Sequence, residues 1–307
     1  MTSQPAVQLN ALRKSYGNVE ALRGLDLTVN EGEIFGFLGP NGSGKTTTIR
    51  CMLDLIRPSG GSIRLLGIDP QQDPVAVRRE TGYLPGELRL NDNLTAEQTL
   101  QYLAGLRGNR LDWDFARQLS DRLELDLSRP IRQFSKGNKQ KVGVVQALMH
   151  RPKLLLLDEP TSGLDPLVQQ KVLRMVEEAR AAGATVFFSS HILSEVQAIA
   201  DRVGIIRIGE IVEIAETDSL IDRSFRRALV RFAVPTDSSA LADLPGVELL
   251  SRTETTAHVQ VEGQMDSLIK ALAHFDVQDF ETERPSLEEI FLTYYEGGAP
   301  KQASIRS

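Results

Sequence analysis

The stretch GPNGSGKTTT, residues 39–48, constrains the fold of this 307-residue chain more than any other. An apolar run precedes it, and apolar residues at helical spacing follow it, so the local order is strand, glycine-rich loop, helix. Gly39, Gly44, Lys45 and Thr46 match the pattern G-x-x-x-x-G-K-[ST]. This pattern in this context predicts a phosphate-binding loop.

The residue types of the loop suit phosphate groups. Its glycines let backbone N–H groups turn inward, and the N-terminus of the following helix adds a positive dipole. We expect Lys45 to meet the outer phosphates of a nucleotide and the hydroxyl of Thr46 to reach Mg²⁺. The expected nucleotide contacts of the loop are Gly39, Pro40, Asn41, Gly42, Ser43, Gly44, Lys45, Thr46 and Thr47.

Two adjacent carboxylates, Asp158 and Glu159, follow a run of four leucines. The run predicts a buried strand, and ligand sites of α/β proteins lie at the carboxyl ends of such strands. Alone, the pair would be read as a solvated strand end. Beside a phosphate loop, Asp158 is expected to hold Mg²⁺ and Glu159 to act as general base toward an attacking water.

The order of patterns along the chain predicts an α/β core with additions. KLLLLDEP and ATVFFSSH are nearly continuous apolar strands separated by a helical segment, which is typical of a parallel sheet buried on both faces. Residues 1–214 are expected to form the nucleotide-binding domain, with a helical subdomain at about 86–150. Alternating runs after residue 215 predict a small α+β domain over 215–296, and residues 297–307 a flexible tail.

Composition limits the class of partner. The net charge of −6 and the pI near 5.4 argue against a nucleic-acid binder. The single cysteine, Cys51, cannot form an internal disulfide, and the start of the chain lacks a secretory pattern. No run reaches the roughly 18 to 20 apolar residues of a membrane helix. We therefore expect a cytoplasmic location, with any membrane role supplied by a partner.

A set of motifs in fixed order carries a family resemblance. RQFSKGNKQKVGVVQAL precedes LLLLDEPTSGLD, and SSHILSEV follows both. Over about residues 7–214 the chain resembles the ATP-binding subunits of ABC transporters. The resemblance implies a P-loop ATPase core with an N-terminal antiparallel β part, and ATP hydrolysis coupled to transport. It also implies a homodimer that sandwiches two ATP molecules, integral membrane permease subunits as partners, and a peripheral place on the cytoplasmic side of the membrane.

The resemblance also assigns roles to residues outside the phosphate loop. Tyr16 would stack on adenine, Asp165 would lie in the segment called the D-loop, and His191 would be the switch histidine. Ser135 and Gly137, in the signature segment, would face the γ-phosphate held by the other copy. Simpler interpretations stay open: strand packing for Tyr16, a helix cap for Ser135 and a buried polar role for His191. The other histidines, His150, His258 and His274, are expected to be structural, and Cys51 a core residue.

The chain departs from the family pattern at two places. Gly86 stands where glutamine is common, so no side chain reaches Mg²⁺ or water from there. Glu87 could take over, a backbone carbonyl with water could do so, or hydrolysis could be slower; we hypothesise that Glu87 replaces the glutamine. Otherwise Glu87 is a solvated loop residue or a permease contact. In the second departure, FSKGN stands where leucine, serine, two glycines and glutamine are more usual. The resemblance implies that Lys136 and Asn138 would lie beside the partner's nucleotide.

The resemblance extends to ATPase subunits of bacterial drug and antibiotic efflux systems, which carry an appendage ending much like PSLEEIFLTYY. It implies the motor subunit of an exporter; the alternative is a subunit of an importer or of a regulatory or resistance complex. The chain lacks the sustained heptads of a chromosome-type ATPase and the second cassette of a translation-type protein. The permease would be moved through contacts near residues 87–93, and the sequence does not indicate the transported compound.

Overall fold

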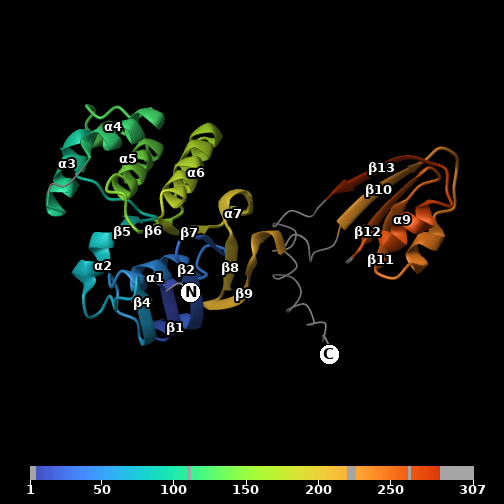
Figure 1. Cartoon of the computed structure of the whole chain (residues 1–307), viewed down its shortest axis with the longest axis horizontal. Helices are drawn as coiled ribbons and strands as arrows, with labels where there is room; N and C mark the ends of the chain where they lie inside the picture. The colour runs from blue at the N-terminus through green and yellow to red at the C-terminus, as the bar shows by residue number, and fades with distance from the viewer. Residues whose placement is uncertain (1–4, 109–111, 220–225, 262–263, 284–307) are drawn as a thin grey trace. The chain divides into compact units, whose positions relative to one another are not determined.

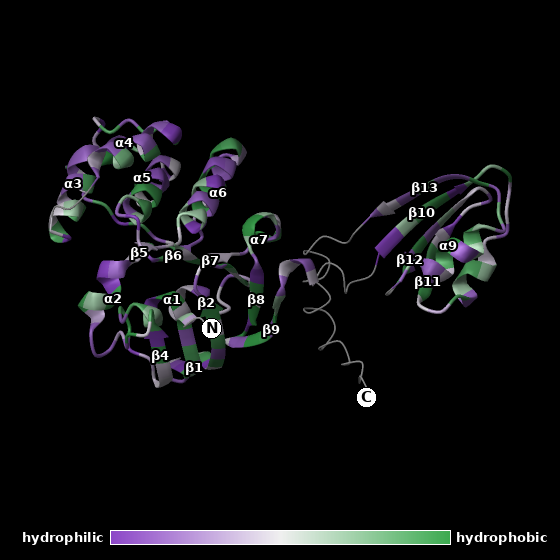
Figure 2. Ribbon diagram, in the orientation of Figure 1, coloured by the Kyte–Doolittle hydropathy of each residue, from purple (hydrophilic) through white to green (hydrophobic). Residues whose placement is uncertain are grey.

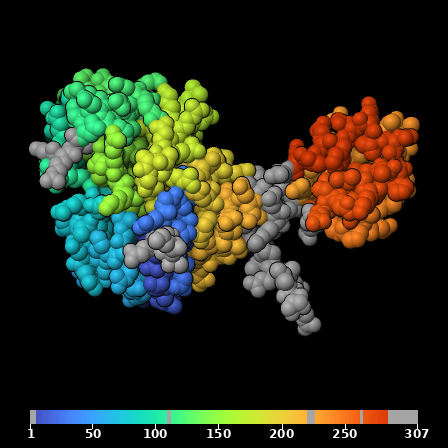
Figure 3. Space-filling view, viewed as in Figure 1, coloured from blue at the N-terminus to red at the C-terminus, as the bar shows by residue number. Residues whose placement is uncertain are grey.

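The computed structural model describes residues 5–108, 112–219, 226–261 and 264–283. The chain divides into two units, Met1–Ile214 and Ala215–Ser307 (Figures 1 and 3), each with its own core. Within the described residues, no helix is both long enough and apolar enough to cross a membrane.

The first unit begins with the antiparallel sheet that the sequence predicts. Strand β1 (Pro5–Tyr16) lies between β2 (Val19–Asn30) and β4 (Gly60–Leu65) and pairs antiparallel with both. Side chains of β2 alternate between buried and exposed, as expected where one face of a sheet packs on a core. That core also contains Ile49 and Met52.

A six-stranded sheet forms the centre of the unit. The neighbouring pairs β5/β6, β6/β7, β7/β3 and β3/β8 are all parallel, so the carboxyl ends of these strands meet at one edge. Strands β3, β6 and β7 are buried along their whole length, as their apolar runs predict. In sheet order the strands are β5 (Thr81–Leu84), β6 (Leu154–Asp158), β7 (Thr185–Ser190), β3 (Ile34–Leu38), β8 (Arg202–Arg207) and β9 (Glu210–Glu216).

Helix α1 is shorter than the sequence predicts. Apolar spacing favours a helix that runs to Ile56, whereas α1 spans Lys45–Met52. Asp54 has a left-handed φ of 49°, and the guanidinium of Arg78 donates hydrogen bonds to the carbonyls of Leu53 and Asp54. The last carbonyls of the helix accept from the backbone amides of Leu53, Asp54 and Leu55, and the distant Arg78 takes the two carbonyls just beyond the helix.

The remaining helices of the first unit flank the six-stranded sheet or form the helical subdomain, called the insert below. Thr95 starts α3 with a capping box, since its hydroxyl accepts from the amide of Gln98 and its own amide donates to the Gln98 side chain. The insert helices are α3 (Ala96–Leu106), α4 (Trp113–Arg122), the 3₁₀ turn η1 (Ile131–Gln133) and α5 (Lys136–Leu148). The remaining helices of this unit are α2 (Pro74–Glu80), α6 (Pro166–Ala181) and α7 (Leu193–Ile199).

The second unit contains a four-stranded antiparallel sheet in the order β11-β12-β10-β13, and its described part includes helix α9. Figure 2 shows β8 of the first unit mostly in green and β13 mostly in purple, and every residue of β13 is exposed. The sequence SLEEIFLTYY, residues 286–295, is a further helix candidate; it and the tail expected over 297–307 lie outside the described residues. The elements are β10 (Arg226–Phe232), η2 (Ser239–Asp243), β11 (Val247–Arg252), β12 (Thr256–Val261), α9 (Asp266–Leu272) and β13 (Val277–Glu283).

Candidate nucleotide site

The phosphate loop joins β3 to α1, and its glycines are required by close neighbours. A Cβ atom on Gly39 would lie 2.5 Å from the carbonyl oxygen of Ile206. Gly44 has a φ of 117°, and a Cβ there would lie 2.8 Å from the side chain of Leu22. Any larger residue would therefore push the loop away from β2 and β8.

Several groups of this loop suit an anion. Gly44 is the N-cap of α1 and has no side chain to occupy the first amides of the helix. The buried hydroxyl of Ser43 has no hydrogen-bond partner. Thr46 and Thr47 are half-buried, while Asn41 and Gly42 are exposed. The geometry is compatible with the expected phosphate contacts.

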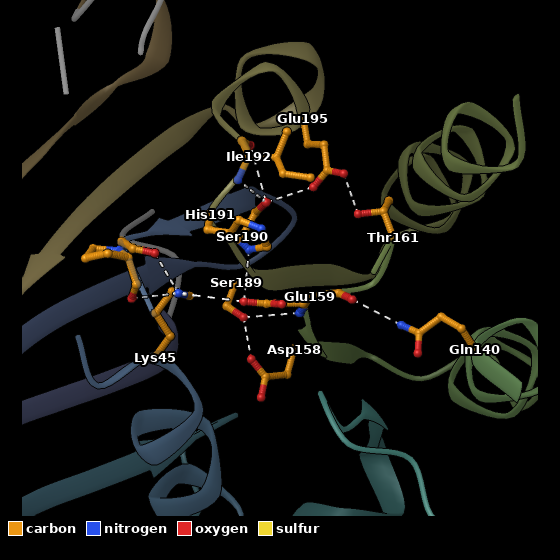
Figure 4. Close-up of polar contacts among 12 residues, drawn as sticks. Lys45, Gln140, Asp158, Glu159, Thr161, Ser189, Ser190, His191, Ile192 and Glu195 are labelled. Atoms are coloured by element: carbon orange, nitrogen blue, oxygen red, sulfur yellow. Dashed lines mark hydrogen bonds and ion pairs between the residues drawn. The ribbon is translucent and has the colours of Figure 1, made fainter. Parts of the chain in front are cut away.

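Lys45 is buried and turns back over the loop. Its ammonium donates to the carbonyl oxygens of Gly39 at 2.6 Å and Pro40 at 3.1 Å, and lies 3.8 Å from Glu159 Oε1 (Figure 4). Burial lowers the pKa of Lys45, and attraction to Glu159 and Asp158 opposes that shift. The phosphate loop and the carboxylate pair thus meet at the carboxyl edge of the sheet, although Lys45 and Asp158 are 113 residues apart in the sequence.

Asp158 ends β6 as a buried carboxyl group with one oxygen free. Its Oδ1 accepts a 2.5 Å hydrogen bond from the hydroxyl of Ser189 on β7, whereas Oδ2 has no partner. Gly86 lies beside that oxygen, since a Cβ on Gly86 would be 3.0 Å from Oδ2. A buried oxygen without a hydrogen bond is the kind of ligand that a divalent cation can take.

Glu159 is held in a strained backbone conformation next to His191. Its φ is 51°, in the left-handed region, and its amide donates to the carbonyl oxygen of Ser189 at 3.1 Å. Its Oε1 lies 3.1 Å from His191 Nδ1. His191 is about half exposed, so it is not the buried polar residue of the simpler interpretation.

The residues expected to face another copy lie on exposed loops and helix ends. Ser135 caps α5 by accepting from the amide of Asn138 at 3.2 Å, and Asp165 caps α6. Gly137 is packed closely, since a Cβ there would lie 2.8 Å from the carbonyl oxygen of Gly163. Among the described residues, no hydrogen bond or ion pair joins Ser135, Gly137 or Asp165 to Lys45.

Tyr16 ends β1 with its ring in contact with solvent. The side chain is 49% exposed, and the ammonium of Lys14 lies 5.0 Å from the ring centroid. A half-exposed aromatic ring that already contacts a cation is not packed as an ordinary core residue. Stacking on a purine remains a prediction for it.

Glu87 is a solvent-exposed side chain paired with a neighbouring cation, which favours the solvated-loop interpretation. Its side chain is 79% exposed and lies 3.8 Å from Arg89. A glycine is often required where a tight turn has a left-handed φ, but Gly86 has no such φ, so a turn does not account for a glycine at this position. The structure favours a different reason for the glycine, which is its close approach to Asp158.

Two buried polar residues near the site were missed by sequence reasoning. Gln140 on α5 donates from Nε2 to the carbonyl oxygens of Glu159 and Pro160, both at 3.1 Å. Glu195 on α7 is buried and accepts from Thr161 and Ser190. Their only sequence signal is a polar residue on the buried face of a helix, which does not identify its partner.

Comparisons with known proteins place these motifs in a family. A family model described as "ABC transporter" matches residues 22–162. The daunorubicin resistance ATP-binding protein DrrA3 of Streptomyces coeruleorubidus is 33% identical over 305 residues, which cover 94% of this chain and 95% of that protein. The chain belongs to the family of ABC transporter ATP-binding proteins.

Further matches extend over the rest of this ABC ATP-binding protein. A model described as "ATP-binding protein DrrA1-3-like, C-terminal domain" matches residues 221–295. The bacitracin transport ATP-binding protein of Bacillus licheniformis is 31% identical over 93% of this chain and 84% of its own length. A solved structure, "Structure of ATP binding subunit of ABC transporter", is 31% identical, has a TM-score of 0.64, and covers 70% of this chain and 91% of that one. These matches confirm the predicted family and fold, and the family is one whose members bind and hydrolyse ATP.

Proposed function

We propose that this chain is the ATP-hydrolysing motor subunit of an exporter that drives a separately encoded membrane permease. Similarity to a bacitracin transport protein and a daunorubicin resistance protein over nearly the whole chain supports export of antibiotics or other hydrophobic compounds. The observation that carries the proposal is the convergence of Lys45, Asp158, Glu159 and His191 at one edge of the sheet.

Each of these side chains has a chemical task in the proposed reaction. The ammonium of Lys45 neutralises the outer phosphates, and Oε1 of Glu159 accepts a proton from the attacking water. As an imidazolium, His191 would donate from Nδ1 to that carboxyl group and from Nε2 to the γ-phosphate, because both ring nitrogens carry protons only in that form. Tyr16 stacks on the adenine.

A magnesium ion fits the chemistry of the donor set. Asp158 and the hydroxyl of Thr46 would hold it, and the free buried Oδ2 of Asp158 supports this assignment. Among the described residues, no group of three or more His, Cys, Asp or Glu side chains could hold a metal ion alone. Mg²⁺ often binds through one carboxylate together with substrate phosphates, where it neutralises developing charge.

The exposed signature segment supports a dimer in which each copy completes the other's site. Ser135 and Gly137 lie at the start of α5, where unpaired amides favour an anion, yet they do not contact Lys45 of their own chain. Asp165 is exposed at the start of α6. A second copy that placed its α5 against the phosphate loop would bring Lys136 and Asn138 to the nucleotide.

A cleft outside the nucleotide site provides a surface for the permease. Its volume is about 810 Å³, and it lies between α2, the end of α3 and the end of α5. Val75 and Leu106 are largely exposed there, and Arg79 and Arg107 also line it. Exposed apolar side chains among cations are typical of a protein-binding surface. The exposed stretch 87–93 is a further candidate contact.

The substitution Glu159→Gln tests the proposed chemistry. Loss of a general base should slow ATP turnover by about 10²-fold or more and leave ATP binding intact. Steady-state phosphate release and isothermal titration calorimetry measure the two quantities. As a comparison, Lys45→Ala should weaken ATP binding itself by about 1.5 to 3 kcal/mol, the typical contribution of a hydrogen bond to a charged group. Turnover of Glu159→Gln close to wild type would remove Glu159 from the role of base.

Export is tested separately with the permease present. Inside-out membrane vesicles that contain the co-purifying permease should accumulate a hydrophobic antibiotic when ATP is added, because the cytoplasmic face is then outside. The Glu159→Gln protein should abolish accumulation. ATP-driven release of compound from preloaded inside-out vesicles would instead indicate import.

A further inference from the structure

Glu195 is a buried carboxyl group close to the site but outside the proposed chemistry. Only 5% of the residue is exposed, and it lies on α7, four residues after His191. A buried polar group is destabilising unless hydrogen bonds satisfy it. Both carboxyl oxygens are satisfied: Oε1 accepts from the hydroxyl of Thr161, and Oε2 accepts from the hydroxyl of Ser190 at 2.8 Å (Figure 4).

One hydroxyl group lies on the loop that carries Glu159, and the other lies on the last residue of β7, directly before His191. Thr161 follows Glu159 by two residues, and Ser190 immediately precedes His191. The hydroxyl of Ser190 also accepts from the amide of Ile192 at 2.9 Å, so it contacts the chain beyond His191 as well. Glu195 therefore links the loop after β6 to the end of β7, where the loop with His191 begins.

The link continues a connection that the strands themselves no longer make, because the pairing of β6 with β7 stops before Thr161, while Ser190 still pairs with Leu38 of β3. The β6/β7 ladder ends at the pair Asp158 and Ser189, and beyond it the amide of Glu159 still donates to Ser189. Glu159 then adopts its left-handed φ, a conformation that persists only when neighbouring groups hold it. The 3.1 Å contact between Glu159 and His191 depends on where both loops lie.

We propose that Glu195 is a positioning residue for ATP hydrolysis, which fixes Glu159 relative to His191 by holding Thr161 and Ser190 together. The proposal rests on the proposed function, since it assumes that Glu159 and His191 act in the reaction. Glu195 itself does not touch the nucleotide loop: its hydrogen bonds go to Thr161 and Ser190.

The decisive substitution is Glu195→Ala in the full chain. Because displacement of a reactive group by about 1 Å can cost 10²-fold in rate, kcat should fall by about 10- to 100-fold. The dissociation constant of ATP should stay within about two-fold, since Lys45 keeps its own partners. A kcat equal to wild type would overturn the proposal, and so would an equal loss of ATP binding and turnover.

Conservative substitutions separate positioning from simple loss of stability. Glu195→Gln keeps one carbonyl oxygen and offers an amide to the second hydroxyl, so it should recover most of the lost kcat. Thr161→Val and Ser190→Ala each remove one link and should each show part of the loss. If Glu195→Ala does not fold, as judged by circular dichroism, these three variants still decide: wild-type kcat in both loop variants would contradict the proposal.

Asp201 provides a matched control just after α7. Its Oδ2 accepts from the amide of Ile34 at 2.8 Å, and it pairs with Arg180, so Asp201→Ala also removes bonds from a side chain near this helix. It contacts neither loop of the site. We expect Asp201→Ala to lower the melting temperature with kcat unchanged. An equal fall of kcat in Asp201→Ala and Glu195→Ala would show a general effect of stability and sink the proposal.

The double variant Glu159→Gln with Glu195→Ala distinguishes this proposal from the proposed function. If Glu195 acts through Glu159, the second change should slow Glu159→Gln by less than about two-fold, because groups that act as a unit are not additive. A full further loss would contradict positioning of Glu159. If Glu159→Gln alone keeps wild-type turnover, the proposed function fails first; if Glu159→Gln is slow and Glu195→Ala is fast, only the inference about Glu195 fails.

Discussion

At the residue scale, Gly86 is the position where the smallest change should have a clear effect. A Cβ there would lie 3.0 Å from Asp158 Oδ2 and 3.3 Å from its Cγ, so Gly86→Ala must displace the carboxyl group by some tenths of an ångström. Mutation of a residue that orients a metal ligand typically lowers metal affinity by about 10- to 100-fold. We expect Gly86→Ala to raise the Mg²⁺ concentration for half-maximal ATPase activity by about 10-fold.

The control for this prediction is Gly60→Ala. A Cβ on Gly60 would meet only ordinary contacts, with Arg13 atoms at 3.7 Å, and Gly60 has no left-handed φ. Its Mg²⁺ dependence should match wild type. Binding of ATP without Mg²⁺, measured in EDTA, should be the same in both variants. An unchanged Mg²⁺ requirement in Gly86→Ala would show that Asp158 tolerates the methyl group.

His150 should make stability depend on pH. Burial lowers the pKa of His150 from 6.5 to about 4, with Arg107 as a second cause. The pKa of His150 is lower in the folded state than in the unfolded state, so protonation favours unfolding. The stability that the neutral His150 allows is complete above pH 6.5 and is lost as pH falls toward 4. The loss is at most about 3 kcal/mol, from about 1.4 kcal/mol per pKa unit. The free energy of unfolding, measured with denaturant between pH 7.5 and 5, should fall less in His150→Gln than in wild type. An equal fall in both proteins would contradict this.

Sequence reasoning found the site residues that lie in local motifs and missed those defined by a distant partner. Lys45 and Glu159 stand at fixed spacings that the chemistry requires, so a pattern can find them. Ser189 matters because it donates to Asp158, 31 residues earlier, and Gln140 because it donates to Glu159, 19 residues later. Glu87 was chosen for being adjacent to Gly86 in sequence; its side chain is exposed, and its role at the Mg²⁺ stays a prediction.

At the element scale, strands buried on both faces were the most predictable feature. The continuous apolar runs of β3, β6 and β7 distinguish them from one-sided strands, whatever their neighbours are. The end of α1 was not predictable in the same way. Apolar spacing extends beyond Met52, but the chain adopts a left-handed φ at Asp54, and Arg78, 25 residues from Leu53, donates to the carbonyl oxygens of Leu53 and Asp54 just after the helix. The spacing of apolar residues indicates which face of a helix is buried, but it carries no information about a hydrogen-bond donor that is distant in the sequence.

At the scale of the whole molecule, the change in sequence pattern near residue 215 coincides with the division of the structure after Ile214. The pattern changes there because a buried parallel sheet and an antiparallel sheet with one solvated face need different runs of apolar residues. The order of strands within each sheet was beyond sequence reasoning. It depends on which segments pair, and β3 pairs with β7 and β8 rather than with β6.

That strand order has a consequence for the time at which the site can form during synthesis. Strand β7 lies between β3, which leads into the phosphate loop, and β6, which ends at Asp158. A nascent chain that has emerged only to residue 180 contains both motifs but lacks the strand that holds them side by side. Ribosome-bound chains of increasing length should therefore bind a fluorescent ATP analogue only once β7 and β8 have left the exit tunnel. Until then β3 and β6 each lack the strand that lies between them, and such unpaired strand edges favour aggregation during synthesis.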